Sequence, residues 1–476
     1  MTAFGRELEL AQLSLKSERL RTKEAPRSLF ERVQGRFQNA FLLESAIGEQ
    51  RLAEYSFIGF EPRSVVTVKD GEVAIRNTDG SKDAIRPEDP LDSIRSLVTP
   101  AGSALKSPFR FVGGAVGYIS YDAIRYWERL PTMAEDDFGL PDMEFGIYTD
   151  GIVFDHLKKG VHYYSLGEDR SSEIASLAGE SSDPAGRELT ARQKAVPTVD
   201  KDRFEAMVLE AKKQITAGDI FQVVLSKRYD FELDGELSVF YDALRAINPS
   251  PYMYFLKFGD RKIVGSSPEM LVRVEDRKIE TFPIAGTRPH LPDKKKNAKL
   301  TAEMLADPKE RAEHTMLVDL ARNDVGRVAA YGTVKVPELF TVQQFSHVQH
   351  IVSRVTGALR PEFDSFDAMR AMFPAGTVSG APKPRAMEMI EELEPVRRGP
   401  YAGALGYFSF NGNCDFAITI RTLVARRNKC SIQSGAGIVA DSDPEKEWME
   451  TEAKAAGLMR AVERATGTNP VGGARR

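Results

Sequence analysis

The sequence predicts a fold in which strands and helices are mixed. Before residue 167 the segments are mostly strand-like: residues 64–68 are rich in β-branched side chains and lead into a turn, and residues 111–118 have the same character. After residue 198, helices and strands alternate. An amphipathic helix is expected at 201–217, because its apolar residues recur on one face and Gly218 follows it, and a strand is expected at 221–226.

Composition places the chain among folded proteins with a sizeable core. It has 476 residues, of which 42% are hydrophobic and 28% charged. A prior of roughly 150 residues per domain predicts two or three domains, or one large intertwined body. The net charge of −4 argues against general binding to nucleic acids or to anionic membranes.

The cysteine and hydropathy patterns narrow the class further. Cys414 and Cys430 are too few for a disulfide framework or a cysteine-based zinc site, and there is no His-Glu-x-x-His motif. The N-terminus has no apolar signal core, and no run of about 18 apolar residues occurs. We therefore expect a cytoplasmic protein with no membrane segment, whose metal and acid–base chemistry depends mainly on carboxylates.

The most polar internal stretch, residues 167–198, is rich in Ser, Glu and Gly. It is expected to be either a linker between domains or a long surface loop within one domain. It separates an N-terminal region, 1–166, from a second region, 199–465. Residues 466–476 are expected to form a flexible tail.

Two short glycine-dotted segments resemble each other. Residues 113–118 read Gly-Gly-Ala-Val-Gly-Tyr and residues 402–407 read Ala-Gly-Ala-Leu-Gly-Tyr. Glycine inside a strand indicates close approach of another backbone or of a ligand. The resemblance is either coincidental or a sign of two related sheets that share a core.

Two predicted helices each carry a pair of glutamates near the first turn. The residues that share a face are Glu310 and Glu313 in the helix that begins at Asp307, and Glu447, Glu450 and Lys454 in the helix that begins at Asp443. Acids near a helix start commonly just complement the helix dipole. Because both faces then become apolar, the alternative is that the two helices together hold Mg²⁺, which prefers oxygen ligands and needs only one or two carboxylates.

Glycine-rich loops and two further side chains complete the candidate chemistry. Residues 376–385 form a loop before a helix, with Ser379 as the expected N-cap, and are either an ordinary helix start or an anion site. The segment 434–437 could present N–H groups to a carboxylate. Arg421, in the expected strand 416–422, needs an anionic partner if it is buried. His350 faces inward as a core histidine or as a group that contacts substrate. Together these residues suit a small dianionic substrate with Mg²⁺.

Four motifs resemble those of the chorismate-utilising enzymes. They are residues 283–288 (Pro-Ile-Ala-Gly-Thr-Arg), 317–324 (Leu-Val-Asp-Leu-Ala-Arg-Asn-Asp), 379–383 (Ser-Gly-Ala-Pro-Lys) and 434–438 (Ser-Gly-Ala-Gly-Ile). The resemblance implies an α+β fold, a large two-subdomain antiparallel β-sandwich with helices outside, of the anthranilate synthase large-subunit type. It also implies that 1–166 carries effector-site elements and co-folds with the core, and that 199–465 is the chorismate-binding catalytic region.

The resemblance assigns roles to individual residues. Glu313 and Glu450 would be the Mg²⁺ ligands, with Glu310 and Glu447 beside them. Gly437 and Lys454 would hold the ring carboxylate of chorismate. Tyr401, Arg421 and the Gly435 backbone would hold the enolpyruvyl carboxylate. His350 and Thr377 would lie near the departing C4 hydroxyl, and the remaining substrate contacts would be Gly286, Thr287 and Ala436.

Two departures from the family pattern indicate which branch this is. Gln222 stands where water-using isochorismate and salicylate synthases have a lysine base, and Ala285 stands where many aminodeoxychorismate synthases have a nucleophilic lysine. Both imply direct attack by ammonia, as in the anthranilate synthases of tryptophan biosynthesis. The alternatives are aminodeoxychorismate synthase component I, an isochorismate or salicylate synthase, and a non-catalytic relative.

The resemblance also implies an inhibitor and a partner. Ser45, Pro251, Tyr252 and Met253 would surround tryptophan as a feedback inhibitor, whereas residues 48–56 do not align securely. No Cys-His glutaminase region is present, so a separate glutamine amidotransferase subunit would supply ammonia in a heterodimer or heterotetramer.

Overall fold

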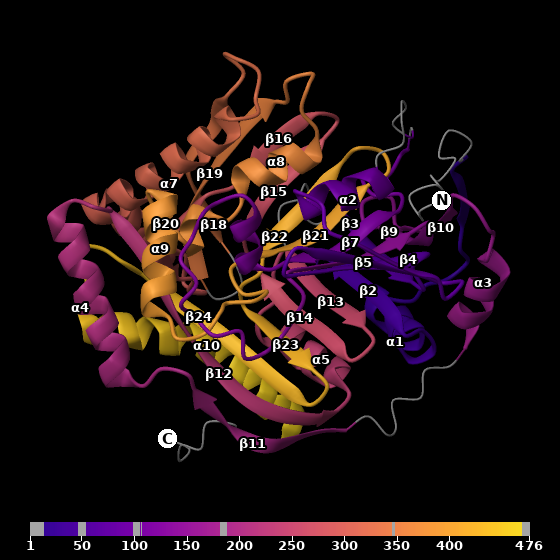
Figure 1. The fold of residues 1–476 in the computed structure, drawn as a ribbon, viewed down its shortest axis with the longest axis horizontal. Coiled ribbons are helices and arrows are strands. Elements are labelled where there is room, and N and C mark those ends of the chain that lie inside the picture. The colour runs from indigo at the N-terminus through magenta and orange to yellow at the C-terminus, as the bar shows by residue number, and fades with distance from the viewer. Residues whose placement is uncertain are drawn as a thin grey trace.

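Two antiparallel sheets packed face to face form the body of the protein (Figure 1). The structure is a computed structural model and describes residues 14–45, 54–98, 105, 107–180, 188–344 and 348–468. Within these residues each sheet has twelve strands. The predicted α+β class, with antiparallel sheets and outer helices, is confirmed.

The first sheet contains strands from both halves of the chain. In spatial order its strands are β1 (Lys16–Arg19), β10 (Gly160–Ser165), β9 (Asp150–Asp155), β3 (Tyr55–Phe60), β2 (Asn39–Glu44), β13 (Tyr252–Phe258), β14 (Arg261–Ser267), β23 (Thr422–Arg426), β24 (Lys429–Ile438), β12 (Gln222–Gly235) and β11 (Leu189–Pro197), with β20 (Gly380–Ala381) also paired to β12.

The second sheet mixes the two halves in the same way. In spatial order its strands are β17 (Ile284–Pro289), β19 (Val348–Ala358), β16 (Lys278–Thr281), β15 (Met270–Glu275), β22 (Cys414–Ile418), β21 (Ala404–Ser409), β7 (Gly114–Ile119), β8 (Met143–Tyr148), β4 (Ser64–Lys69), β5 (Glu72–Asn77) and β6 (Lys82–Ile85), with β18 (Lys335–Gln344) also paired to β19.

The helices cover the outer faces of this sandwich (Figure 1). They are α1 (Pro26–Arg36), α2 (Pro90–Val98), α3 (Ser171–Gly179), α4 (Lys201–Ala217), α5 (Leu237–Ile247), α6 (Lys294–Ala306), α7 (Pro308–Gly326), α8 (Ser365–Met372), α9 (Lys383–Leu393) and α10 (Pro444–Thr466), with short 3-10 helices η3 (Tyr121–Tyr126) and η4 (Gly376–Val378). The helix predicted at 201–217 is confirmed, and Gly218 ends it in the left-handed region at φ 90°.

Side-chain alternation along the strands separates the core into layers. On β7, Val116 and Tyr118 point between the sheets, where they meet Tyr254 of β13 from the first sheet, whereas Ala115 and Ile119 belong to the cluster under the outer helices. Alternate residues of one strand therefore serve two separate apolar layers.

The glycine-dotted segments are neighbours in one sheet. β7 pairs with β21 so that Gly117 lies opposite Gly406. A Cβ atom would lie 1.9 Å from the Glu144 carbonyl oxygen at Gly117, and 2.0 Å from the Asp415 carbonyl oxygen at Gly406. The predicted close approach is thus that of adjacent backbones, and the two segments belong to one sheet rather than to two related sheets.

Two regular elements lie within the stretch 167–198, which the sequence predicts to be a linker or a long surface loop. Residues 171–179 form α3, which buries Ile174 and Leu177, and β11 pairs with β12 at the edge of the first sheet. Most β11 side chains are exposed, because β11 is an edge strand. Its sequence is therefore polar, like that of a linker. Residues 181–187 and the tail from 469 lie outside the described residues.

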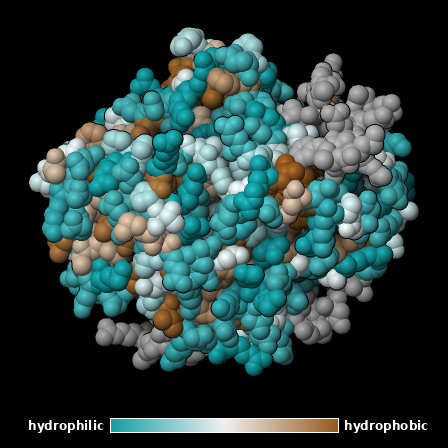
Figure 2. All heavy atoms as spheres, viewed as in Figure 1, coloured by the Kyte–Doolittle hydropathy of each residue, from teal (hydrophilic) through white to brown (hydrophobic). Residues whose placement is uncertain are grey.

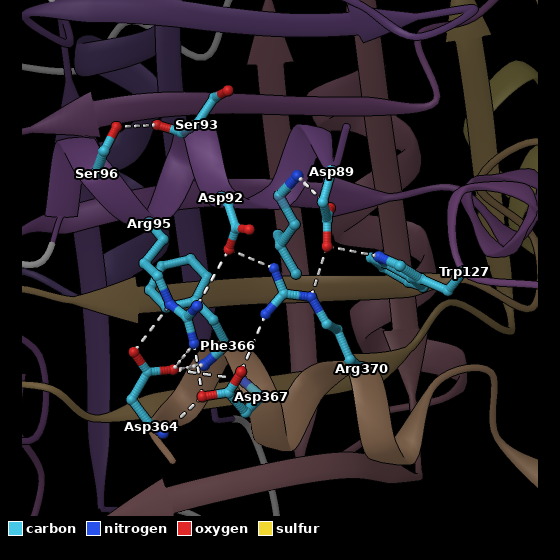
Figure 3. Close-up of polar contacts among 11 residues, drawn as sticks. Asp89, Asp92, Ser93, Arg95, Ser96, Trp127, Asp364, Phe366, Asp367 and Arg370 are labelled. Atoms are coloured by element: carbon cyan, nitrogen blue, oxygen red, sulfur yellow. Dashed lines mark hydrogen bonds and ion pairs between the residues drawn. The ribbon is translucent and has the colours of Figure 1, made fainter. Parts of the chain in front are cut away.

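A polar network joins α2 of the first half to α8 of the second (Figure 3). Arg95 donates to Asp364 at 2.8 Å, and Arg370 donates to Asp89 at 2.7 Å. Asp89 also accepts from the Trp127 indole at 3.0 Å. Because these partners lie far apart in sequence, the two halves of the chain are held together by side chains as well as by the shared sheets.

The surface in Figure 2 is mostly hydrophilic, with hydrophobic residues scattered singly or in small groups. Among the helices that the structure describes, none is long and apolar enough to cross a membrane.

Candidate active site

A cleft between the ends of the two sheets gathers most of the predicted site residues. It has an empty volume of about 1410 Å³ and is bordered by β12 and β24 of the first sheet, β17 and β19 of the second, and α7, α10 and η4. The predicted residues that line it are Gln222, Gly286, Thr287, Glu313, His350, Thr377, Tyr401, Arg421, Gly435, Gly437, Glu447, Glu450 and Lys454.

Two predicted residues do not line the cleft. Ala436 is fully buried in the apolar cluster on the other side of β24, because alternate residues of a strand point to opposite faces. Its side chain therefore does not face the cleft, and its contact with substrate stays a prediction. Glu310 lies in the first turn of α7 and accepts a hydrogen bond from Arg288 at 2.8 Å, so it borders the cleft without facing into it.

The glutamates of α7 and α10 crowd one side of the cleft. Both helices start as the sequence predicts, with the carboxylates of Asp307 and Asp443 capping backbone N–H groups. The pKa of Glu313 is raised by burial and by the negative charges of Glu310 and Glu450. The pKa of Glu447 is also raised, first by burial and then by Glu450. Carboxyl groups whose pKa is raised by neighbouring negative charges favour a cation beside them.

The donor set fits magnesium if other oxygens complete it. Among the described residues, no group of three or more His, Cys, Asp or Glu side chains is arranged to hold a metal ion. Glu313 and Glu450 are two carboxylates at the cleft, and Mg²⁺ commonly takes one or two carboxylates together with water and substrate oxygens. Glu450 also pairs with Lys454 at 2.7 Å, so a bound cation would compete with that lysine.

Arg421 places a positive charge in the cleft. It lies between β22 and β23 with φ 52°, outside the strand that the sequence predicts, because the chain turns there to enter β23. Burial lowers the pKa of its guanidinium. Among the residues that the structure describes, no carboxylate lies within ion-pair distance of it. A buried cation without a carboxylate partner needs an anionic ligand.

Gly435 and Gly437 leave space for a ligand at the base of the cleft, because neither has a side chain. They lie on β24 opposite Ser226 and Val224 of β12. A Cβ atom at Gly437 would lie 2.5 Å from the Gln222 amide nitrogen, and one at Gly435 would lie 2.9 Å from the Tyr401 hydroxyl. Lys454 donates to the Gly435 carbonyl oxygen at 2.9 Å, which places its charge at this base. Small residues here leave space for a ligand beside a positive charge.

The loop 376–385 is built differently from the expected capped helix. Ser379 donates to the Ala375 carbonyl at 2.8 Å, and Pro382 occupies the N-cap position of α9. β20 within this loop pairs with Gln222 and Val223 of β12. The loop therefore extends the first sheet, and Ser379 as N-cap is a wrong prediction.

Glu269 is a cleft residue that sequence reasoning missed. It lies between β14 and β15, is buried, and accepts a hydrogen bond from the Thr377 hydroxyl at 2.8 Å. Burial raises the pKa of Glu269 to about 7, against the lowering effects of Thr377 and Lys454. A carboxyl group after Pro268 at the junction of two apolar strands was the available signal, because an acid there must be either paired or functional.

His350 is held in a defined orientation by β17. Its Nδ1 lies 2.8 Å from the Gly286 carbonyl oxygen and 3.1 Å from the Thr287 hydroxyl. Because a carbonyl only accepts, we assign the ring proton to Nδ1. Burial lowers the pKa of His350, so the ring is neutral at pH 7 and Nε2 carries a lone pair.

Gln222 brings an unsatisfied amide oxygen to the cleft. The side chain is buried, and among the described residues Oε1 has no hydrogen-bond partner. A buried acceptor without a partner costs free energy unless a ligand or water supplies a donor.

A second cavity between the sheets gathers the four predicted effector residues, Ser45, Pro251, Tyr252 and Met253. Its empty volume is about 460 Å³. Sequence reasoning missed Arg110, Arg273 and Asp415, which also line it. Arg273 lies between two valines of a buried strand, and a buried arginine needs an anionic partner, so this signal was present in the sequence. We call this the effector cavity; residues 46–53 lie outside the described part of the chain.

Comparison with known proteins places the chain in a family. Residues 38–460 match the family model described as chorismate binding enzyme. Anthranilate synthase component 1 of Methanothermobacter thermautotrophicus is 49% identical over 447 residues, which make up 94% of each protein. The crystal structure of anthranilate synthase component I from Streptococcus pneumoniae TIGR4 matches with a TM-score of 0.77 at 39% identity, over 87% of this chain and 93% of that one.

A more distant structure shares the fold alone. The menaquinone-specific isochorismate synthase of Escherichia coli matches with a TM-score of 0.71 at 21% identity, over 97% of this chain and 99% of that one. Because the family model spans most of the sequence and the relatives are similar over nearly their full length, this chain belongs to the family of chorismate binding enzymes.

Proposed function

We propose that this chain is the large subunit of an anthranilate synthase, which converts chorismate and ammonia into anthranilate and pyruvate in the first step of tryptophan biosynthesis. The observation that carries the proposal is Arg421, a cation of the cleft with no carboxylate partner among the described residues. With Lys454, it suits a substrate that has two carboxylates. Chorismate is such a dianion.

The two ends of the cleft hold the two carboxylates of chorismate. Gly437 and Lys454 bind the ring carboxylate beside Glu313 and Glu450, the proposed Mg²⁺ ligands. Tyr401, Arg421 and the Gly435 backbone bind the enolpyruvyl carboxylate. When bound, Mg²⁺ neutralises the ring carboxylate and eases addition to the ring.

Ammonia adds at C2 of the ring while the C4 hydroxyl leaves as water. Glu269 supplies the proton for the hydroxyl, because its pKa of about 7 leaves a protonated fraction at neutral pH. Gln222 cannot deprotonate water, but its free Oε1 can accept an N–H of ammonia. Ala285, which also lines the cleft, offers no nucleophile of its own, so the C–N bond forms with ammonia directly.

Pyruvate then leaves from 2-amino-2-deoxyisochorismate. Nε2 of the neutral His350 takes the proton from C2, the ring becomes aromatic, and the enolpyruvyl group departs and is protonated to pyruvate. This assignment makes His350 a base rather than the acid at the C4 hydroxyl, because burial disfavours its protonated form.

Ammonia comes from a separate glutamine amidotransferase subunit. Cys414 and Cys430 are both buried within strands, and burial raises the pKa of each thiol, so neither is an available nucleophile for a glutaminase. Component 1 in the relatives' name agrees with a two-component enzyme. A heteromeric assembly in the cytoplasm, with tryptophan binding in the effector cavity as feedback inhibitor, completes the proposal.

The test is direct synthesis. The purified chain is incubated with chorismate, MgCl₂ and an ammonium salt, and we expect anthranilate fluorescence together with an equal amount of pyruvate. Glu450→Ala should abolish the magnesium-dependent signal, whereas Glu445→Ala, on the exposed side of the same helix turn, should not. An amino product that accumulates without pyruvate until a lyase is added would contradict the proposal and indicate an aminodeoxychorismate synthase.

A further inference from the structure

Arg398 and Glu394 form a buried ion pair that no step of the proposed reaction uses. Their side chains are only 1% and 3% exposed. Arg398 donates from Nη2 to Glu394 Oε1 at 2.6 Å and from Nε to Oε2 at 2.9 Å. A pair so deeply buried is costly unless its remaining hydrogen-bonding groups are also satisfied. Its other contacts therefore indicate what the pair holds in place.

The pair takes the place of a missing strand beside β12. β20 pairs with β12 only at Gln222 and Val223. Beyond that point, Arg398 Nη2 donates to the Val224 carbonyl at 2.7 Å, and Glu394 Oε1 accepts from the Ser226 backbone N–H at 2.8 Å. These side chains satisfy backbone groups that a neighbouring strand would otherwise satisfy. They hold β12 where it carries Gln222 and Val224 to the cleft.

The same guanidinium also holds the loop that carries Thr377. Arg398 Nη1 donates to the Val378 carbonyl at 2.7 Å, one residue from Thr377. Thr377 in turn donates to Glu269 at 2.8 Å. The guanidinium also lies over the ring of Tyr401, 5.7 Å from its centroid. The Arg398 side chain thus contacts three segments that border the cleft, at Val224, Val378 and Tyr401, without lining the cleft itself.

We propose that Arg398 is a positioning residue: by binding the Val224 and Val378 carbonyls at once, it fixes the Thr377–Glu269 pair against the strand that carries Gln222. The inference rests on the proposed function for the role of Glu269, whereas the contacts stand without it. A lysine at this position keeps the charge but lacks the planar fork that reaches all of these acceptors.

The proposal predicts how Glu269 responds to a change at Arg398. The hydrogen bond from Thr377 lowers the pKa of Glu269, and so does the charge of Lys454 on α10. The other charged or titratable groups of the cleft are Lys309, Glu313, His350, Arg421, Glu447 and Glu450. Among the described residues, none of these groups forms a hydrogen bond or ion pair with Arg398, so loosening the contact with the Val378 carbonyl should act on Glu269 through Thr377 and raise its pKa.

The experiment titrates Glu269 directly. pH-difference infrared spectra follow its carboxyl band, which Glu269→Gln identifies by removing it. Arg398→Lys should raise the midpoint by roughly half to one pH unit, the size expected for one lost hydrogen bond. Thr377→Val should give a similar shift, and the double variant no further shift. Arg397→Lys is the matched control, because Arg397 lies near Asp136 at 3.9 Å and is not bonded to the Thr377 loop.

Several outcomes would overturn the inference. They are an unchanged midpoint in a folded Arg398→Lys protein, a shift of equal size in Arg397→Lys, and shifts that add in the double variant. If Arg398→Lys does not fold, Glu394→Gln gives the same test, because it keeps an acceptor for Ser226 but removes the charge that orients Arg398. The titration needs no turnover, so a wild-type protein that makes no anthranilate refutes the proposed function and leaves this test readable.

Discussion

The cleft and the effector cavity both lie between the sheets, but they differ in whether their buried charged side chains have partners of opposite charge. In the effector cavity, Arg273 pairs with Asp415 at 2.7 Å, and Asp415 also accepts from Tyr252 at 2.9 Å. In the cleft, Arg421 has no carboxylate within ion-pair distance among the described residues, and the pKa of Glu313 is raised by its acidic neighbours. Paired charges suit a ligand of little net charge, whereas unpaired charges call for a charged substrate and a cation.

The largest expected effect comes from replacing Glu269, whose protonated carboxyl group is the proposed general acid. Glu269→Gln should lower kcat by roughly 10²- to 10⁴-fold, the usual range for loss of a general acid. The wild type needs Glu269 protonated, so its kcat should fall as the pH rises past about 7. The residual activity of the variant should lack this decline, because an amide does not titrate. A pH profile of kcat between pH 6 and 9 measures both.

The control for this change is Glu303→Gln, a glutamate exposed on α6. It should keep the wild-type profile. If kcat of Glu269→Gln still declined at alkaline pH, the titrating acid would be another group of the cleft. Glu269 would then have a structural role, like the paired charges of the effector cavity.

The second prediction concerns the unpaired cation itself. Arg421→Met keeps the bulk of the side chain but removes the charge that would bind a substrate carboxylate, so kcat/KM for chorismate should fall by roughly 10²- to 10³-fold, as for the loss of one partner from a buried ion pair. Thermal stability should stay the same or rise, because a buried charge without a protein partner is removed. Steady-state kinetics and calorimetry check the two effects.

Arg427→Met is the matched control for Arg421→Met. The Arg427 side chain is 82% exposed and pairs with Asp260. It should change neither measurement. A marked loss of stability in Arg421→Met would show that Arg421 is already paired in the free protein, and the contrast between the two cavities would disappear.

Many features of the cleft and of the fold could be predicted from local sequence. The caps at Asp307 and Asp443, the spacing of the glutamates and the glycines of β24 depend on neighbours in the chain, and the structure brings them to one cleft. The family and the α+β class are confirmed by the comparisons. These features follow from helix and strand periodicity and from motif spacing.

What could not be predicted depends on long-range packing. Glu269 and Thr377 are distant in sequence and meet only because η4 folds onto the β14–β15 junction. β11 looked like a linker because an edge strand needs few apolar residues. The Ala436 side chain points away from the cleft, which could not be predicted because the direction of each side chain on β24 depends on its register with β12.

The third prediction tests the crowded acids. Removing magnesium with EDTA should abolish activity, and added Mg²⁺ should restore it. Glu450→Gln should raise the Mg²⁺ concentration for half-maximal activity by roughly 10- to 100-fold, while Glu445→Gln should leave it unchanged. Mg²⁺ titrations at saturating chorismate measure this. Full activity of both variants in EDTA would mean that the raised pKa of Glu313 reflects burial alone.

The smallest expected effect lies in the effector cavity. Ser45 lines it, and a phenylalanine there would fill space that the structure leaves open beside Tyr252. Overfilling a site costs about 1–3 kcal/mol, so Ser45→Phe should raise the tryptophan concentration for half-inhibition at least about fivefold. Because Arg273 and Asp415 of this cavity are already paired with each other, kcat and KM without tryptophan should stay close to wild type. Ser172→Phe, at an exposed position of α3, is the control and should remain fully sensitive. Equal inhibition of both variants would place tryptophan elsewhere; loss of basal activity in Ser45→Phe alone would mean that the effector cavity supports the cleft even when no effector is bound.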